Sequence, residues 1–183
     1  MLKNISLLLL ALLALLLQSG AQAQNTSAQS GIKVRPRGMK LIVTSQRKKH
    51  LLDVSDSVDA ARLDEVSVIF GTRRQDFLYL LVDACGSSKL TSDDRQCGAG
   101  QECNLLWIKL TSAWKINEIK SVRYESCWQP ITSNNAFQIK GNTLQFDYSD
   151  LREEKEYRVT YDADHPESGL HIEESAIKNN ESR

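Results

Sequence analysis

The segment "DFLYLLVD", residues 76–83, is apolar at six of its eight positions, and the segment "NLLWIKLT", residues 104–111, has the same character. Aromatic and branched aliphatic residues in runs this short favour strands over helices. Neither run alternates regularly between apolar and polar residues, so both faces of each are expected to be buried. We therefore predict that the two runs are neighbouring antiparallel strands at the centre of the fold.

Shorter strand-like runs lie on both sides of this central pair. Leu144, Phe146 and Tyr148 alternate with polar residues, and Gly141-Asn142 is a two-residue hairpin signal. Ser55 or Asp56 is a candidate N-cap for one short helix near residues 56–63. The chain is thus predicted to be all-β, an antiparallel sandwich or up-and-down barrel of about eight to ten short strands. The other predicted strands are 39–45, 49–54, 65–70, 116–126, 136–140, 155–162 and 169–174.

The N-terminal segment has the features of a secretory signal peptide. Lys3 precedes a leucine- and alanine-rich run at 7–17, and Ala21-Gln22-Ala23 is a small-residue cleavage site. This run is shorter than the ~20 residues that a membrane-spanning helix needs. We therefore expect a secreted or periplasmic protein that does not span the membrane. The predicted organisation is a signal peptide at 1–23, a flexible basic lead-in at 24–38, a single β domain at 39–176 and a disordered tail at 177–183.

The chain has four cysteines, an even number, which in an oxidising compartment predicts two disulfides. Cys85 follows the first central run and Cys103 precedes the second, so a bridge between them would close the intervening loop, 86–102. The other bridge would then join Cys97 and Cys127. The alternative pairing, Cys97 with Cys103 and Cys85 with Cys127, remains open at this point.

The stretch "CGAGQEC", residues 97–103, raises the question of phosphate or metal binding. Phosphate-binding glycine loops lead into a helix, whereas this stretch leads into a predicted strand. Gly98 and Gly100 are instead expected to supply positive φ angles where the loop folds back. Cysteines tied up in disulfides are unavailable as zinc ligands or as nucleophiles. No cofactor is predicted.

Two further enzyme signatures are absent from the sequence, namely a G-x-S-x-G elbow and H-E-x-x-H. The turn "DADHPESG" carries Asp162, Asp164 and Glu167, but the calcium-loop pattern stops after two ligands, so no metal site is predicted. Paired carboxylates from separate strands are compatible with a secreted hydrolase, which we keep as an alternative. Whether the protein is an enzyme is left open, with the balance towards a non-catalytic role.

The charges are balanced overall but unevenly placed. Cleavage of the signal peptide removes Lys3 and leaves 22 of the 23 basic residues against 23 acidic ones, which disfavours nucleic-acid binding. The segment 33–49 nevertheless holds only basic charges, and such an arm suits an anionic surface. An alternative is therefore a structural envelope protein that docks through this arm. The candidate residues are Lys33, Arg35, Arg37, Arg47, Lys48 and Lys49.

Aromatic residues gather in the cysteine-bearing half of the chain. Trp114, Trp128 and Tyr124 are candidates for contacts with a sugar ring or a protein partner, because aromatic rings dominate such interfaces. Our leading hypothesis is an exported, disulfide-stabilised, non-catalytic β domain. It would bind a protein or carbohydrate partner in the cell envelope, for example as an inhibitor.

Overall fold

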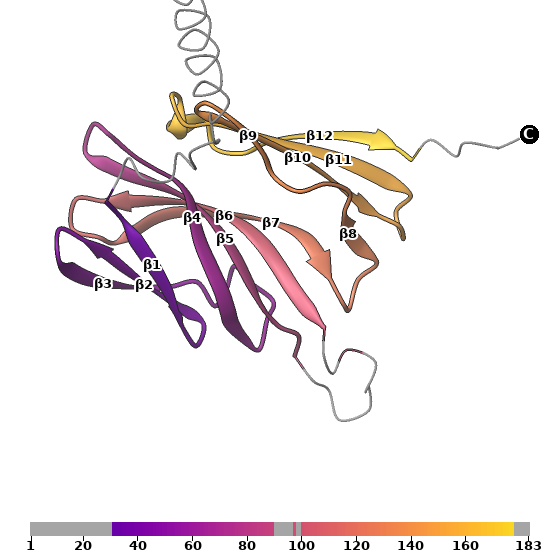
Figure 1. Cartoon of the computed structure of the whole chain (residues 1–183), viewed down its shortest axis with the longest axis horizontal. Helices are drawn as coiled ribbons and strands as arrows, with labels where there is room; N and C mark the ends of the chain where they lie inside the picture. The colour runs from indigo at the N-terminus through magenta and orange to yellow at the C-terminus, as the bar shows by residue number, and fades with distance from the viewer. Residues whose placement is uncertain (1–30, 90–96, 98–99, 178–183) are drawn as a thin grey trace, which may run out of the picture.

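The computed structural model describes residues 31–89, 97 and 100–177 (Figure 1). The predicted all-β, antiparallel class is confirmed, and the described residues include only one short 3₁₀ turn, Pro166–Ser168. The strands are β1 (Lys33–Arg37), β2 (Lys40–Ser45), β3 (Lys48–Asp53), β4 (Arg62–Arg74), β5 (Phe77–Ser87), β6 (Gln101–Thr111), β7 (Ile116–Ser126), β8 (Ile131–Ser133), β9 (Gln138–Lys140), β10 (Thr143–Asp150), β11 (Lys155–Asp162) and β12 (His171–Ala176).

The strands form two sheets. A nine-stranded sheet has the order β12-β11-β10-β8-β7-β6-β5-β4, with β9 paired to β10, and a three-stranded sheet has the order β1-β2-β3. The large sheet bends, so that β9–β12 lie over one face of β4–β7, while β1–β3 lie on the other side (Figure 1). Since β4 and β12 are the ends of the large sheet, the fold is the sandwich of the two predicted alternatives.

The central strands β5 and β6 are buried on both faces, as predicted. Leu78, Leu80 and Val82 belong to an aliphatic core that also contains Leu41 of the small sheet. The residues between them point the opposite way, since side chains alternate along a strand. They enter an aromatic core whose members include Tyr79, Leu81, Trp107, Phe146 and Tyr161.

Both disulfides have the predicted pairing. Cys85 and Cys103 are direct cross-strand partners in β5 and β6. Cys97 is joined to Cys127, which follows β7. The alternative pairing is thereby excluded. The reason proposed for the loop glycines needs correction at Gly100, whose φ is not positive. A Cβ there would collide with the Cys127 side chain, so close approach requires the glycine; Gly98 lies outside the described residues.

The short helix predicted near 56–63 is wrong. Residues 55–57 form a turn, and the chain then enters β4 at Arg62. The Asp53 carboxylate accepts hydrogen bonds from the backbone and hydroxyl of Ser55, a local turn that competes with helix formation. Val58 and Ala60 both insert into the aliphatic core, which fits an extended segment.

The boundary of the predicted lead-in also changes. Lys33–Arg37, the last part of the 24–38 segment, is strand β1 and pairs with β2. The predicted signal peptide, residues 24–30 and residues 178–183 lie outside the described residues. Within the described residues, no helix is long and apolar enough to cross a membrane.

Candidate functional site

A polar cleft of about 490 Å³ lies beside the central strands. Its walls come from the β3–β4 connection, from Lys89 after β5, and from the side chains of β6 and β7 that face away from the aromatic core. The lining residues are Ser55, Asp56, Ser57, Val58, Asp59, Lys89, Asn104, Ser121, Arg123 and Gln129. The cleft therefore brings together segments that are distant in the sequence.

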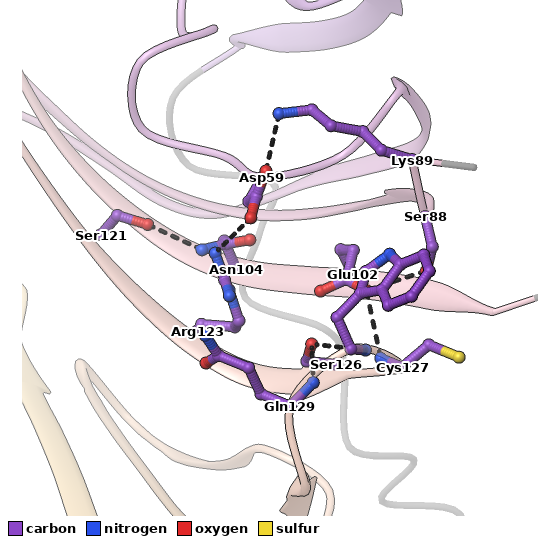
Figure 2. Close-up of polar contacts among 11 residues, drawn as sticks. Asp59, Ser88, Lys89, Glu102, Asn104, Ser121, Arg123, Ser126, Cys127 and Gln129 are labelled. Carbon is purple, nitrogen blue, oxygen red and sulfur yellow. Dashed lines mark hydrogen bonds and ion pairs between the residues drawn. The ribbon is translucent and has the colours of Figure 1, made fainter. Parts of the chain in front are cut away.

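Asp59 joins the two cations of the cleft (Figure 2). One carboxylate oxygen lies 2.6 Å from Lys89 Nζ and the other lies 3.3 Å from Arg123 Nη2. The hydrogen bond from Lys89 and the charges of both partners lower the pKa of Asp59. The carboxylate is thus held ionised and the two cationic side chains are held across the cleft.

Asn104 and Arg123 each carry a polar atom without a hydrogen-bond partner among the described residues. Asn104 is only 3% exposed, and its Nδ2 donates to Ser121 Oγ at 2.9 Å. Its Oδ1 is buried and accepts no hydrogen bond, and the buried Nε of Arg123 donates none. Leaving such a group unpaired costs about 1–3 kcal/mol. The cleft therefore offers one acceptor and one donor beside the Ser121 hydroxyl.

A second polar cluster holds β6 against the Cys97–Cys127 disulfide (Figure 2). Glu102 is 1% exposed, and its Oε1 accepts from Ser88 Oγ at 2.8 Å and from the Cys127 backbone at 3.1 Å. Next to it, Ser126 Oγ accepts from the backbone N–H groups of Trp128 and Gln129. These bonds fix the turn that supplies Gln129 to the cleft.

The predicted aromatic contact residues do not form one surface. Trp114 is half-buried against the aliphatic core and stacks on His50, with ring centres 3.9 Å apart. Trp128 is half-buried in the turn after β7. Tyr124 is 7% exposed and lies in the aromatic core, so its prediction as a surface contact is wrong. An aromatic residue in an alternating strand reads the same whether it faces solvent or core.

Tyr124 belongs to a partly buried pair with Asp83. Its hydroxyl donates to the Asp83 carboxylate at 2.6 Å, near the Cys85–Cys103 disulfide. Burial raises the pKa of Asp83, and the nearby charge of Glu65 adds to this effect. Burial and the Asp83 charge also raise the pKa of Tyr124. This pair is the most strongly perturbed acid of the aromatic core.

The basic candidates occupy the small sheet, while the carboxylates considered for a metal have separate partners. Asp162 lies 2.9 Å from His165 Nδ1, Asp164 accepts from Asn142 Nδ2 at 2.8 Å, and Glu167 pairs with Arg74 at 3.4 Å. Across residues 31–89, 97 and 100–177, no cluster of three metal-ligating side chains forms. The basic candidates are Lys33, Arg35 and Arg37 on β1, Arg47 in the β2–β3 turn, and Lys48 and Lys49 on β3.

Sequence reasoning missed the main residues of the cleft, namely Asp59, Asn104 and Arg123. The available signal was a polar residue at the start of a run buried on both faces: Asn104 opens "NLLWIKLT", and a buried polar residue needs partners. Asp59 was assigned to a helix that does not form. Neither family models, curated proteins nor solved structures match this chain.

Proposed function

We propose that this protein is an exported, non-catalytic β domain that binds a carbohydrate in the polar cleft. The two disulfides and the signal-peptide features of the N-terminus are the support for export, because disulfides persist in oxidising compartments. The cleft is the support for binding. A protein partner, the other ligand class predicted from the sequence, has less support, because the aromatic candidates do not form one exposed surface.

The observation that carries this proposal is the unpaired donor and acceptor at Arg123 and Asn104. A ligand hydroxyl both donates and accepts, so one sugar ring with adjacent hydroxyls can satisfy both atoms after small side-chain adjustments. The recovered hydrogen bonds would offset the cost of leaving these atoms unpaired in the free protein.

The charges of the cleft favour a neutral ligand over an anion. Asp56 and Asp59 balance Lys89 and Arg123, and Asp59 is paired with both cations. A phosphate or carboxylate would compete with Asp59 for these cations. A polyhydroxylated ligand needs no net charge and has hydroxyls to match the serines that line the cleft.

The support of the cleft is consistent with a binding role. Asn104 and Arg123 are cross-strand partners on β6 and β7, and the Cys97–Cys127 disulfide and Glu102 hold the adjoining turn. A site on strands that are fixed before binding loses less conformational entropy when the ligand arrives.

The test is calorimetric or NMR titration of the mature protein with a panel of neutral oligosaccharides and peptidoglycan fragments. For a ligand that binds, Asn104→Ala should weaken affinity about tenfold or more, since an unmatched hydrogen bond costs at least about 1 kcal/mol. Arg123→Lys keeps the charge beside Asp59 but lacks the Nε donor, so it should also weaken binding. Lys140→Ala, on the exposed strand β9, is the matched control and should leave affinity unchanged.

Two results would contradict the proposal. One is a panel without any binder, or binding that persists unchanged in both cleft variants while their thermal unfolding matches the parent protein. The other is turnover of a polysaccharide that a single carboxylate substitution abolishes, which would favour the hydrolase alternative.

A further inference from the structure

The three-stranded sheet has one buried and one outward face. Register and alternation place Leu41, Val43 and Leu52 on the face that enters the aliphatic core. The opposite face is formed by the intervening residues of each strand. In cross-strand rows these are Lys33–Thr44–Lys49, Arg35–Ile42–Leu51 and Arg37–Lys40–Asp53, which we call the basic face.

The basic face carries a strong excess of positive charge. Five of its nine residues are lysine or arginine, and its acid, Asp53, forms an ion pair of 3.0 Å with Lys40. Among the described residues, the other four cations of this face take part in no ion pair. They are Lys33, Arg35, Arg37 and Lys49.

An apolar centre lies within this charge. Leu51 is 50% exposed and Ile42, its cross-strand neighbour, is half-buried in the same row as Arg35. A soluble polyanion has no use for an exposed leucine between cations. A lipid bilayer does, because apolar side chains enter the acyl boundary while cations stay among anionic headgroups.

The rest of the molecule gives the charge a direction. Acidic side chains gather on β10–β12, in the layer on the far side of β4–β7 from the small sheet (Figure 1). Glu156, Glu173 and Glu174 line a shallow polar hollow there, with Asp147 and its partner Arg158. A membrane that attracts the basic face would therefore repel the opposite layer, which favours one orientation.

We propose that the basic face docks on a bilayer that contains anionic phospholipid, with Leu51 at the acyl boundary. The proposal goes beyond carbohydrate binding and does not depend on it. It assigns the basic residues predicted as an anionic-surface arm to a folded sheet face, with Lys40 added and with Arg47 and Lys48 outside the face.

The test is sedimentation of the mature protein with vesicles of phosphatidylcholine, with and without phosphatidylglycerol. Binding should require phosphatidylglycerol and weaken with salt, since exposed charges are screened. Arg35→Ala should weaken binding about fivefold, the effect expected of one Lys or Arg near an anionic surface. Leu51→Ser should weaken it by a similar or larger factor without changing the charge.

Controls separate the membrane from other readings. Arg152→Ala, an exposed cation in the turn after β10, removes the same charge elsewhere and should bind vesicles like the parent protein. Asn104→Ala should also bind normally, because the cleft is a separate site. Circular dichroism of each variant checks that it is folded.

Three outcomes would overturn the proposal. Vesicle binding that does not depend on phosphatidylglycerol is one, and the absence of any vesicle binding is another. The third is binding of heparin and anionic vesicles alike that Arg35→Ala weakens but Leu51→Ser does not, which would identify the face as a site for soluble polyanions.

Discussion

The two cores on either side of β5 and β6 differ in chemistry although the same strands supply both. The core under the small sheet is aliphatic, with Leu80, Val82 and Ile108 fully buried. The core under β10–β12 is aromatic and contains hydroxyl and indole groups that need partners. The difference shows that alternation along one strand can serve two kinds of packing, one non-directional and one fixed by hydrogen bonds.

The largest effect is expected in the aromatic core. Trp107 is 1% exposed, and its Nε1 donates to the Pro166 carbonyl at 2.9 Å. Trp107→Ala should destabilise the protein by about 3–5 kcal/mol, as is usual for a buried aromatic residue. Urea denaturation measures this loss. Trp107→Phe keeps most of the packing and should lose less, so equal losses would contradict the assigned role of the ring.

The aliphatic core should give a slightly smaller effect with a different distribution. Leu80→Ala removes a fully buried side chain and should cost about 2–5 kcal/mol. Because this core holds the small sheet, hydrogen exchange should accelerate more in β2 and β3 than in β10 and β11. Equal acceleration in all four strands would show that the two cores unfold as one unit.

Two tyrosines test the directional bonds of the aromatic core. Tyr124→Phe removes the donor to Asp83 and should cost about 1.5–3 kcal/mol, the range for a hydrogen bond to a charged group. Tyr161→Phe removes a buried hydroxyl that has no partner among the described residues, so it should be close to neutral. Thermal unfolding compares the two, and a larger loss for Tyr161→Phe would reverse the interpretation.

The smallest effect concerns two carboxylates with opposite pKa shifts. Burial raises the pKa of Asp83, so its favourable contribution is present at low pH and is lost as pH rises through the raised value. Hydrogen bonds from Lys40 and Ser55 lower the pKa of Asp53 to about 2. Its contribution is therefore present above the usual value and is lost as pH falls towards 2.

Unfolding measured across acidic pH separates the two carboxylates. Asp83→Asn keeps an acceptor for Tyr124 and should be at least as stable as the parent protein at neutral pH, with the advantage shrinking on acidification. Asp53→Asn should be less stable at neutral pH and should converge with the parent protein in acid. The same pH profile for both variants would contradict the assigned shifts.

The sequence was sufficient to predict features that repeat along the chain. Alternation identified most strands, two-sided apolar runs identified β5 and β6, and strand proximity paired Cys85 with Cys103. It failed for the short strands β1 and β8, and it failed where a local cap signal competed with burial, as at Val58 and Ala60. Local propensity is weak compared with the burial of two apolar side chains.

The cleft was not predictable because it depends on tertiary contacts. Asp59, Lys89 and Arg123 meet only after the β3–β4 connection lies beside β6 and β7. The basic residues were recognised as a charged arm, but only strand register shows that Lys40 joins them while Arg47 and Lys48 do not. Pairing between strands sets which side chains share a face, and a single strand does not reveal it.

The most direct test of the cleft is an NMR titration that follows the Asn104 side-chain amide and the Arg123 Nε–H group during addition of the best-binding oligosaccharide. We expect both signals to shift together and to saturate at the same ligand concentration, while signals from β9 and β12 remain unchanged. Saturating shifts elsewhere in the protein, with these two signals unmoved, would contradict carbohydrate binding in the cleft.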